Sequence, residues 1–288
     1  MIYIVLSILA SSILFVIFKL FGRFKVNSFQ AIVFNYLTAC TFGFSVYGKP
    51  VNILGLSNFS WFYYALGLGL IFIAVFYLMA ITTQKNGLSV VAVASKMSVV
   101  IPIIAGVFVY NESIGRLKVA GILIALASIY LVTVNPNKIK GSSLIYPFLV
   151  FLGSGFIDAS LKFLQTNYVK ASDVSIFSAT LFGTAGLAGI ILFLLQMFQG
   201  TFKFQFKNLI GGVILGLVNY FSIYFLVKAI GYKGLESSTF FVINNIGILL
   251  ITALLGLILF REKLSQQNRL GILLAVIGIV LVSFSDSF

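Results

Sequence analysis

The chain alternates long apolar runs with short polar or Gly/Pro-rich breaks along its whole length. An α-helix needs about 17 to 25 predominantly apolar residues to cross a bilayer. Runs of this length predict ten membrane spans, five in each half of the chain, and therefore an all-α integral membrane protein. The expected spans cover residues 2–20, 28–47, 60–81, 88–110, 117–134, 144–166, 174–198, 209–230, 236–260 and 267–284.

The composition excludes a soluble domain. Hydrophobic residues make up 60% of the chain and charged residues 9%, too few to build a surface that faces water. The net charge of +13 lies mainly in the short breaks, for example at Lys19, Arg23 and Lys25. This distribution favours anchoring at a membrane surface over binding a phosphate backbone. We therefore expect a multi-pass protein of the inner (plasma) membrane, with lipids and not nucleic acid as partners.

The two halves of the chain repeat each other. The offset that places Glu262 on Glu112 also places Gly271 on Gly121, and residues 121–125 (Gly-Ile-Leu-Ile-Ala) then match residues 271–275 (Gly-Ile-Leu-Leu-Ala). We expect repeats at 1–138 and 141–288. Because five spans is an odd number, the two copies must enter the membrane in opposite orientations. Such inverted repeats place a substrate site near the bilayer midplane.

Each half ends with a helix, then Glu112 or Glu262, then a helix that carries Gly121 or Gly271, and Pro102 precedes Glu112 by about three helical turns. This arrangement resembles the EamA-like branch of the drug/metabolite transporter superfamily. The resemblance implies two five-helix repeats and a central cavity lined by the first, third, fourth, sixth, eighth and ninth spans. It also implies the movement of metabolites, often outward.

Two positions depart from a strict repeat. Thr252 stands where a second copy of Pro102 would fall, and Ser128 stands opposite Gly278. In the first repeat, Pro102 removes a backbone hydrogen bond and can kink its helix, either near the cavity or merely to fit its neighbours. We interpret Glu112, Glu262 and Pro102 as repeat-related hinge residues.

Polar side chains inside the spans are the candidates for a site, since they are costly in a bilayer. Lys96 lies deep in the 88–110 span, where its stem can reach only part of the way to the surface. It would bind a substrate carboxylate or phosphate in a hydrated cavity, or else contact a carbonyl or helix end. The corresponding region of the second repeat carries Asn244 and Asn245, which with Lys96 could form a polar wall across the pseudo-twofold axis.

Asp158 is the only acid well inside a predicted span, and Lys162 follows one helical turn later on the same face. The two residues form either an ion pair that lets the helix insert or a site at which Asp158 couples transport to protons. Lys19, Tyr77 and Tyr224 are further substrate-binding candidates. Snorkelling of the lysine and core packing of the tyrosines are the alternatives.

The chain contains no histidine, which removes Ser-His catalysis, zinc-histidine sites and haem-ligating histidine. We expect no enzyme activity, no cofactor and no metal. Lysines outnumber the acid inside the spans, which favours an anionic or zwitterionic cargo such as an amino acid. The lysines concerned are Lys19, Lys96, Lys162 and Lys228. We predict a secondary active transporter, an exporter that works by alternating access as a monomer or homodimer, with proton coupling left open. A flippase for a lipid-linked sugar or other amphiphile, and a channel, are the alternatives.

Overall fold

The computed structural model describes residues 2–48, 54–86, 88–112, 115–133, 145–198, 204–231, 236–260 and 266–285. These ranges contain eleven α-helices and one short 3₁₀ helix, and no strand. The helices of the first half are α1 (Ile2–Phe24), α2 (Ser28–Tyr47), η1 (Leu54–Asn58), α3 (Phe62–Asn86), α4 (Leu88–Met97), α5 (Val100–Tyr110) and α6 (Arg116–Thr133). Those of the second half are α7 (Ile145–Asn167), α8 (Val174–Phe198), α9 (Phe206–Ile230), α10 (Ser237–Phe260) and α11 (Gln266–Ser285).

The predicted spans correspond to helices of nearly the same bounds, except that the span expected at 88–110 is divided. Helix α4 ends at Met97 and α5 begins at Val100. Pro102 has no N–H to donate to the carbonyl four residues earlier, that of Ser98. The Ile101 N–H bonds to the Ser98 carbonyl instead, at 2.9 Å, in the tighter i to i−3 pattern of a 3₁₀ turn. The proline thus interrupts the helix and does not only bend it.

Seven helices are long and apolar enough to cross a membrane by length and composition: α1, α2, α3, α7, α8, α9 and α10. Two further apolar stretches, Ala94–Tyr110 and Arg269–Val282, are shorter. The first of these contains the interruption between α4 and α5. The architecture is therefore all-helical in the described part of the chain and consistent with a multi-pass membrane protein.

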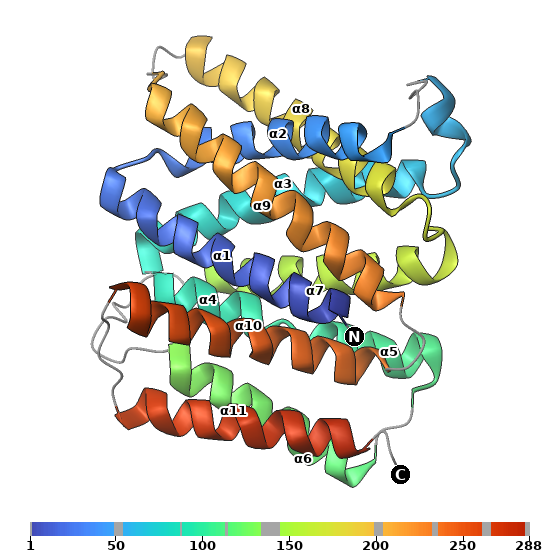
Figure 1. Cartoon of the computed structure of the whole chain (residues 1–288), viewed down its shortest axis with the longest axis vertical. Helices are drawn as coiled ribbons and strands as arrows, with labels where there is room; N and C mark the ends of the chain where they lie inside the picture. The colour runs from blue at the N-terminus through green and yellow to red at the C-terminus, as the bar shows by residue number, and fades with distance from the viewer. Residues whose placement is uncertain are drawn as a thin grey trace. The chain divides into compact units, whose positions relative to one another are not determined.

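The helices form two compact units, one of Met1–Tyr77 with Phe163–Gly231 and the other of Leu78–Lys162 with Tyr232–Phe288. In the first unit α2 packs against α8 and α9, and α1 against α9 (Figure 1). In the second unit α6 packs against α11, and α10 contacts α5, α6 and α11. Each unit therefore takes helices from both halves of the sequence. Residues 134–144, which contain the expected repeat boundary, lie outside the described ranges.

Close packing in the first unit combines small residues with buried hydrogen bonds. A Cβ at Gly216 of α9 would lie 2.6 Å from the Asn35 carbonyl oxygen of α2. One turn further along α9, the Asn219 Nδ2 donates to the Asn35 Oδ1 at 3.0 Å. Small residues and side-chain amides are the usual means of joining helices in a bilayer, where lipid removes the hydrophobic drive between them.

Helix α3 approaches the backbone of α8 closely at Gly69. A Cβ at Gly69 would lie 2.6 Å from the Leu181 carbonyl oxygen and 2.7 Å from the Thr184 Cβ. Gly67, less than one turn earlier on the same helix, has no atom within 4 Å of the corresponding position. Of these two glycines, only Gly69 lies at the close approach of α3 to α8.

Helices α6 and α11, the last of each repeat, lie side by side in the second unit (Figure 1). A Cβ at Gly121 of α6 would lie 2.7 Å from the Val282 Cγ2 of α11. In the other direction, a Cβ at Gly278 of α11 would lie 3.2 Å from the Ala125 nitrogen of α6. Glycine on each helix thus lets the two backbones come close together. The Gly121 of the repeated sequence block has this packing role.

Candidate functional site

Lys96 lies in the last turn of α4, and its ammonium contacts α10. The Lys96 Nζ donates to the Asn245 Oδ1 at 3.2 Å. The Asn245 Nδ2 donates to the Phe241 carbonyl at 3.1 Å, which turns the amide oxygen toward the lysine. Asn245 is buried, and the two side chains come from the corresponding regions of the two sequence repeats. The contact therefore joins one helix from each half of the sequence within this unit.

The interruption between α4 and α5 lies directly beside Lys96. The Val99 N–H bonds to the Lys96 carbonyl at 3.4 Å, and Val99 provides no side-chain cap for α5. The end of one helix therefore meets the start of the next, with a negative carbonyl end and a positive N–H end. Broken helices of this kind supply backbone groups to the binding sites of transporters. The lysine and the interruption together form a polar region inside an otherwise apolar helical stretch.

Asp158 of α7 is the electrostatic partner of Lys96. Helix α7 can approach α5 here because Gly155, one turn before Asp158, leaves room for the Ile101 side chain. Lys96, Asp158 and Asn245 therefore converge from three helices, and we call them the Lys96 cluster. Among the described residues no three His, Cys, Asp or Glu side chains gather as a metal ion requires. The cluster offers one cation, one carboxylate and one amide, which suits the recognition of a charged small molecule.

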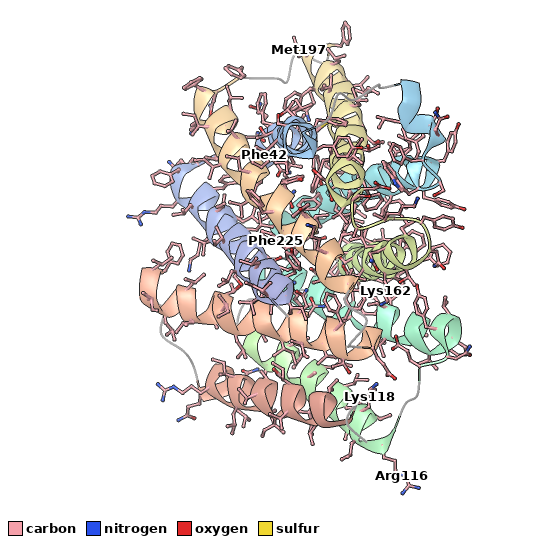
Figure 2. All side chains as sticks on the ribbon, turned by 45° about the vertical axis from the view of Figure 1, so that its right-hand side comes forward. Phe42, Arg116, Lys118, Lys162, Met197 and Phe225 are labelled. Carbon is pink, nitrogen blue, oxygen red and sulfur yellow. The ribbon has the colours of Figure 1, made fainter. Side chains whose placement is uncertain are left out.

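Lys162 has different partners from Asp158, although both lie on α7. Its Nζ lies 5.6 Å from the centroid of the Tyr110 ring, and the Glu112 carboxylate attracts it electrostatically (Figure 2). Glu112 closes the end of α5, since its N–H donates to the Gly106 carbonyl at 3.3 Å and its side chain covers that glycine. Asp158 thus interacts electrostatically with Lys96, and Lys162 with Glu112. Glu262, the expected repeat counterpart of Glu112, lies outside the described residues.

The remaining candidates are distributed over both units. Asn244 is buried on α10, next to Asn245 in sequence, in the second unit. Tyr77, half exposed, packs edge-on against Phe29 in the first unit. Tyr224 stacks on Tyr220 and Lys19 is partly buried on α1, both also in the first unit. The structure thus brings Lys96, Asp158 and Asn245 together within the second unit, with Pro102 near the adjacent interruption.

A salt bridge between Lys118 and Glu236 had no counterpart among the sequence candidates. Lys118 of α6 is 2% exposed and pairs with Glu236, which directly precedes α10 and is 36% exposed (Figure 2). Lys118 lies near the start of a span, where lysines ordinarily face lipid headgroups. The sequence therefore contains little signal that this lysine is buried or that its partner is so far away along the chain.

Comparisons with known proteins find similarity along nearly the whole chain. The model of the EamA-like transporter family matches residues 1–134 and again residues 146–284. An "Uncharacterized protein" of Haemophilus influenzae is 27% identical over 292 residues, which cover 98% of this chain and 97% of that protein. A solved structure described as "Crystal structure of protein" is similar with a TM-score of 0.74, covering 100% of this chain and 98% of that chain. Its identity of 15% makes it a likeness of fold alone.

Proposed function

Because the chain belongs to the EamA-like transporter family, we propose that it is a secondary active transporter that exports a small anionic or zwitterionic metabolite, such as an amino acid. It is a multi-pass membrane protein of the drug/metabolite transporter superfamily. In this proposal ten spans form two inverted five-helix repeats, with α4 and α5 together making one interrupted span. The protein acts in the inner membrane, as a monomer or homodimer, by alternating access and without catalysis.

The observation that supports this proposal is the contact of Lys96 with Asn245 beside the interrupted helix. An ammonium has three hydrogen-bond donors. Lys96 can therefore keep its bond to Asn245 and still bind a substrate carboxylate. Charge-assisted hydrogen bonds of this kind are about twice as strong as neutral ones. The substrate's acid group is proposed to lie at Lys96, near the pseudo-twofold axis about which the two repeats would rearrange.

In this proposal Asp158 accounts for the direction of transport and for its coupling to protons. A zwitterionic amino acid carries an ammonium group next to its carboxylate. With the carboxylate on Lys96, the ammonium can pair with ionised Asp158. A proton on Asp158 would remove this charge, so proton and substrate compete for the same carboxylate. Such competition gives exchange of one for the other, and an inward proton gradient then drives the substrate outward.

The test is transport by purified protein in liposomes, with a panel of radiolabelled amino acids and dicarboxylates. Loss of a charge-assisted hydrogen bond costs about 1.5–3 kcal/mol, or about 10- to 100-fold in affinity. Lys96→Ala is therefore expected to reduce transport by at least about tenfold at subsaturating substrate. Lys170→Ala, which removes an exposed lysine between α7 and α8, is the matched control and should transport normally. Normal transport by a folded Lys96→Ala variant would refute the assignment.

Asp158→Asn separates coupling from binding. An imposed proton gradient should drive export in the parent protein but not in this variant, which should retain some exchange of labelled for unlabelled substrate. Stimulation by substrate on the opposite side also distinguishes a carrier from a channel, which shows no such effect. Movement of a fluorescent lipid-linked sugar, without movement of any soluble metabolite in the panel, would favour the flippase instead.

A further inference from the structure

A second lysine, Lys228, is held between two tyrosine rings in the other unit. Its Nζ lies 4.7 Å from the centroid of the Tyr224 ring and 5.3 Å from that of the Tyr3 ring. Tyr224 is one turn earlier on α9, and Tyr3 lies in the first turn of α1. An ammonium within about 6 Å of a ring centroid is attracted by the ring face, but the contact does not neutralise its charge. The rings therefore position the cation and leave it able to bind an anion.

The packing of α1 on α9 builds this arrangement. The two helices run in opposite directions, since the start of α1 meets the end of α9 at Lys228, whereas Phe21, near the end of α1, packs against Gly211, near the start of α9. Tyr3 also stacks on Phe225 with ring centroids 6.2 Å apart. The Tyr3 ring thus contacts both Phe225 and Lys228 of α9.

The Tyr224 ring is fixed in the same way by its own neighbours. It stacks on Tyr220 with ring centroids 5.6 Å apart. The Tyr220 hydroxyl in turn hydrogen-bonds the Ser175 Oγ of α8 at 2.8 Å, and that Oγ donates to the Gly43 carbonyl of α2 at 2.9 Å. Three helices therefore hold the ring in place before any ligand arrives.

The unit offers almost no negative charge to neutralise Lys228. Asp173 is the only acidic residue in its sequence, residues 1–77 and 163–231. Asp173 accepts from the Ser172 Oγ at 2.8 Å in the turn before α8. Within the described ranges no carboxylate pairs with Lys228, and the lysine is partly buried. A partly desolvated cation without an internal counter-charge is stabilised by an external anion.

We propose that Lys228, Tyr3 and Tyr224 form a binding site for the phosphodiester of an anionic phospholipid. Lys228 lies in the last turn of α9 and Tyr3 in the first turn of α1, with Tyr224 one turn further into α9. Helix ends are where tyrosine and lysine meet lipid headgroups. Exposed apolar side chains follow the same end of α1 at helical spacing and provide a surface for the acyl chains. They are Ile2, Val5, Leu9 and Ile13. Head group and chain thus have adjacent contacts, and a free phosphate would use only the first of them. The site lies in the unit that does not contain the Lys96 cluster.

The test measures lipid binding, which is independent of transport. The purified full chain in phosphatidylcholine nanodiscs is titrated with phosphatidylglycerol, and bound lipid is counted by native mass spectrometry. Lys228→Met is expected to weaken phosphatidylglycerol binding by about tenfold. Lys207→Met removes an exposed lysine at the other end of α9 and should leave binding unchanged. Equal binding by the Lys228 and Lys207 variants, or no preference of the parent protein for the anionic lipid, would overturn the proposal.

A second variant and a competitor test the same lipid site independently of Lys228→Met. Tyr3→Leu removes one ring but no charge, so it answers the question if Lys228→Met fails to fold. Weaker phosphatidylglycerol binding is expected in this variant, and unchanged binding contradicts the site. Inorganic phosphate is added as a competitor at millimolar concentration. It should not displace the lipid, and displacement would overturn the lipid assignment in favour of a site for soluble oxyanions.

Discussion

Two glycines of α3 provide a matched test of the packing between α3 and α8. A Cβ at Gly69 would approach the Leu181 carbonyl oxygen to 2.6 Å, the Thr184 Cβ to 2.7 Å and the Ala185 nitrogen to 3.3 Å. Two of these atoms belong to the backbone of α8, so the new methyl group cannot be accommodated by a side-chain rotation. Gly69→Ala must push the two helices apart, whereas Gly67→Ala adds a methyl group to open space.

The expected magnitudes follow from these contacts. Overpacking costs typically about 1–3 kcal/mol, and alanine recovers about 0.5–1 kcal/mol relative to glycine within a helix. We therefore expect Gly69→Ala to destabilise the protein by about 1–2 kcal/mol net and Gly67→Ala to stabilise it by about 0.5–1 kcal/mol. A difference of about 2 kcal/mol between the variants corresponds to about 4–8 °C in Tm for a domain of this size class.

The assay is thermal unfolding of both variants in the same detergent and at one scan rate, since membrane proteins often unfold irreversibly. Circular dichroism at low temperature confirms that both contain the parental helix content. The expected order of Tm is Gly67→Ala, parent, Gly69→Ala. If the two variants melt together, the close approach of α3 and α8 at Gly69 is refuted.

Two other features give predictions of their own. Glu236→Gln removes the carboxylate that pairs with the buried Lys118 and should lower the free energy of unfolding by about 3 kcal/mol. Lys118→Met leaves the partly exposed Glu236 hydrated and should lower it by only about 1 kcal/mol. Unfolding midpoints in SDS compare the two variants, and equal losses of stability would contradict this difference. Pro102→Ala restores an N–H that can bond to the Ser98 carbonyl and so should join α4 to α5. Hydrogen exchange at residues 98–102 should then become slower, and transport should fall several-fold. If hydrogen exchange and transport both stay as in the parent protein, the proline does not maintain the interruption.

Helix bounds were largely predictable because a bilayer imposes a minimum length on each apolar run. Helix α8, for example, was expected at residues 174–198 and spans Val174–Phe198. The interruption between α4 and α5 was indicated by Pro102 but not located by it. A proline leaves its gap at the carbonyl four residues earlier, and here the helix breaks at Ser98 and Val99. The residue that causes the break and the residues that form it are therefore different.

The similarity between the two halves of the sequence predicted only one part of the candidate site. The symmetry suggested that Lys96 and the asparagines of α10 belong together, and the structure joins Lys96 to Asn245. A helical wheel places Asp158 and Lys162 on one face of α7 but does not reveal which neighbour each meets. Their partners, Lys96 and Glu112, depend on how α7 packs, which the close approach at Gly155 determines.

The packing of α6 against α11 also sets an order of events during biosynthesis. Gly121 faces Val282, so the glycine face of α6 meets its partner only after α7, α8, α9 and α10 have left the ribosome. At about 5–20 residues per second, that interval is on the order of ten seconds. During this interval the close-packing face of α6 lacks its partner helix. Completion of the second unit therefore waits for α11, and a chain that stalls before α11 would leave this glycine face of α6 uncovered.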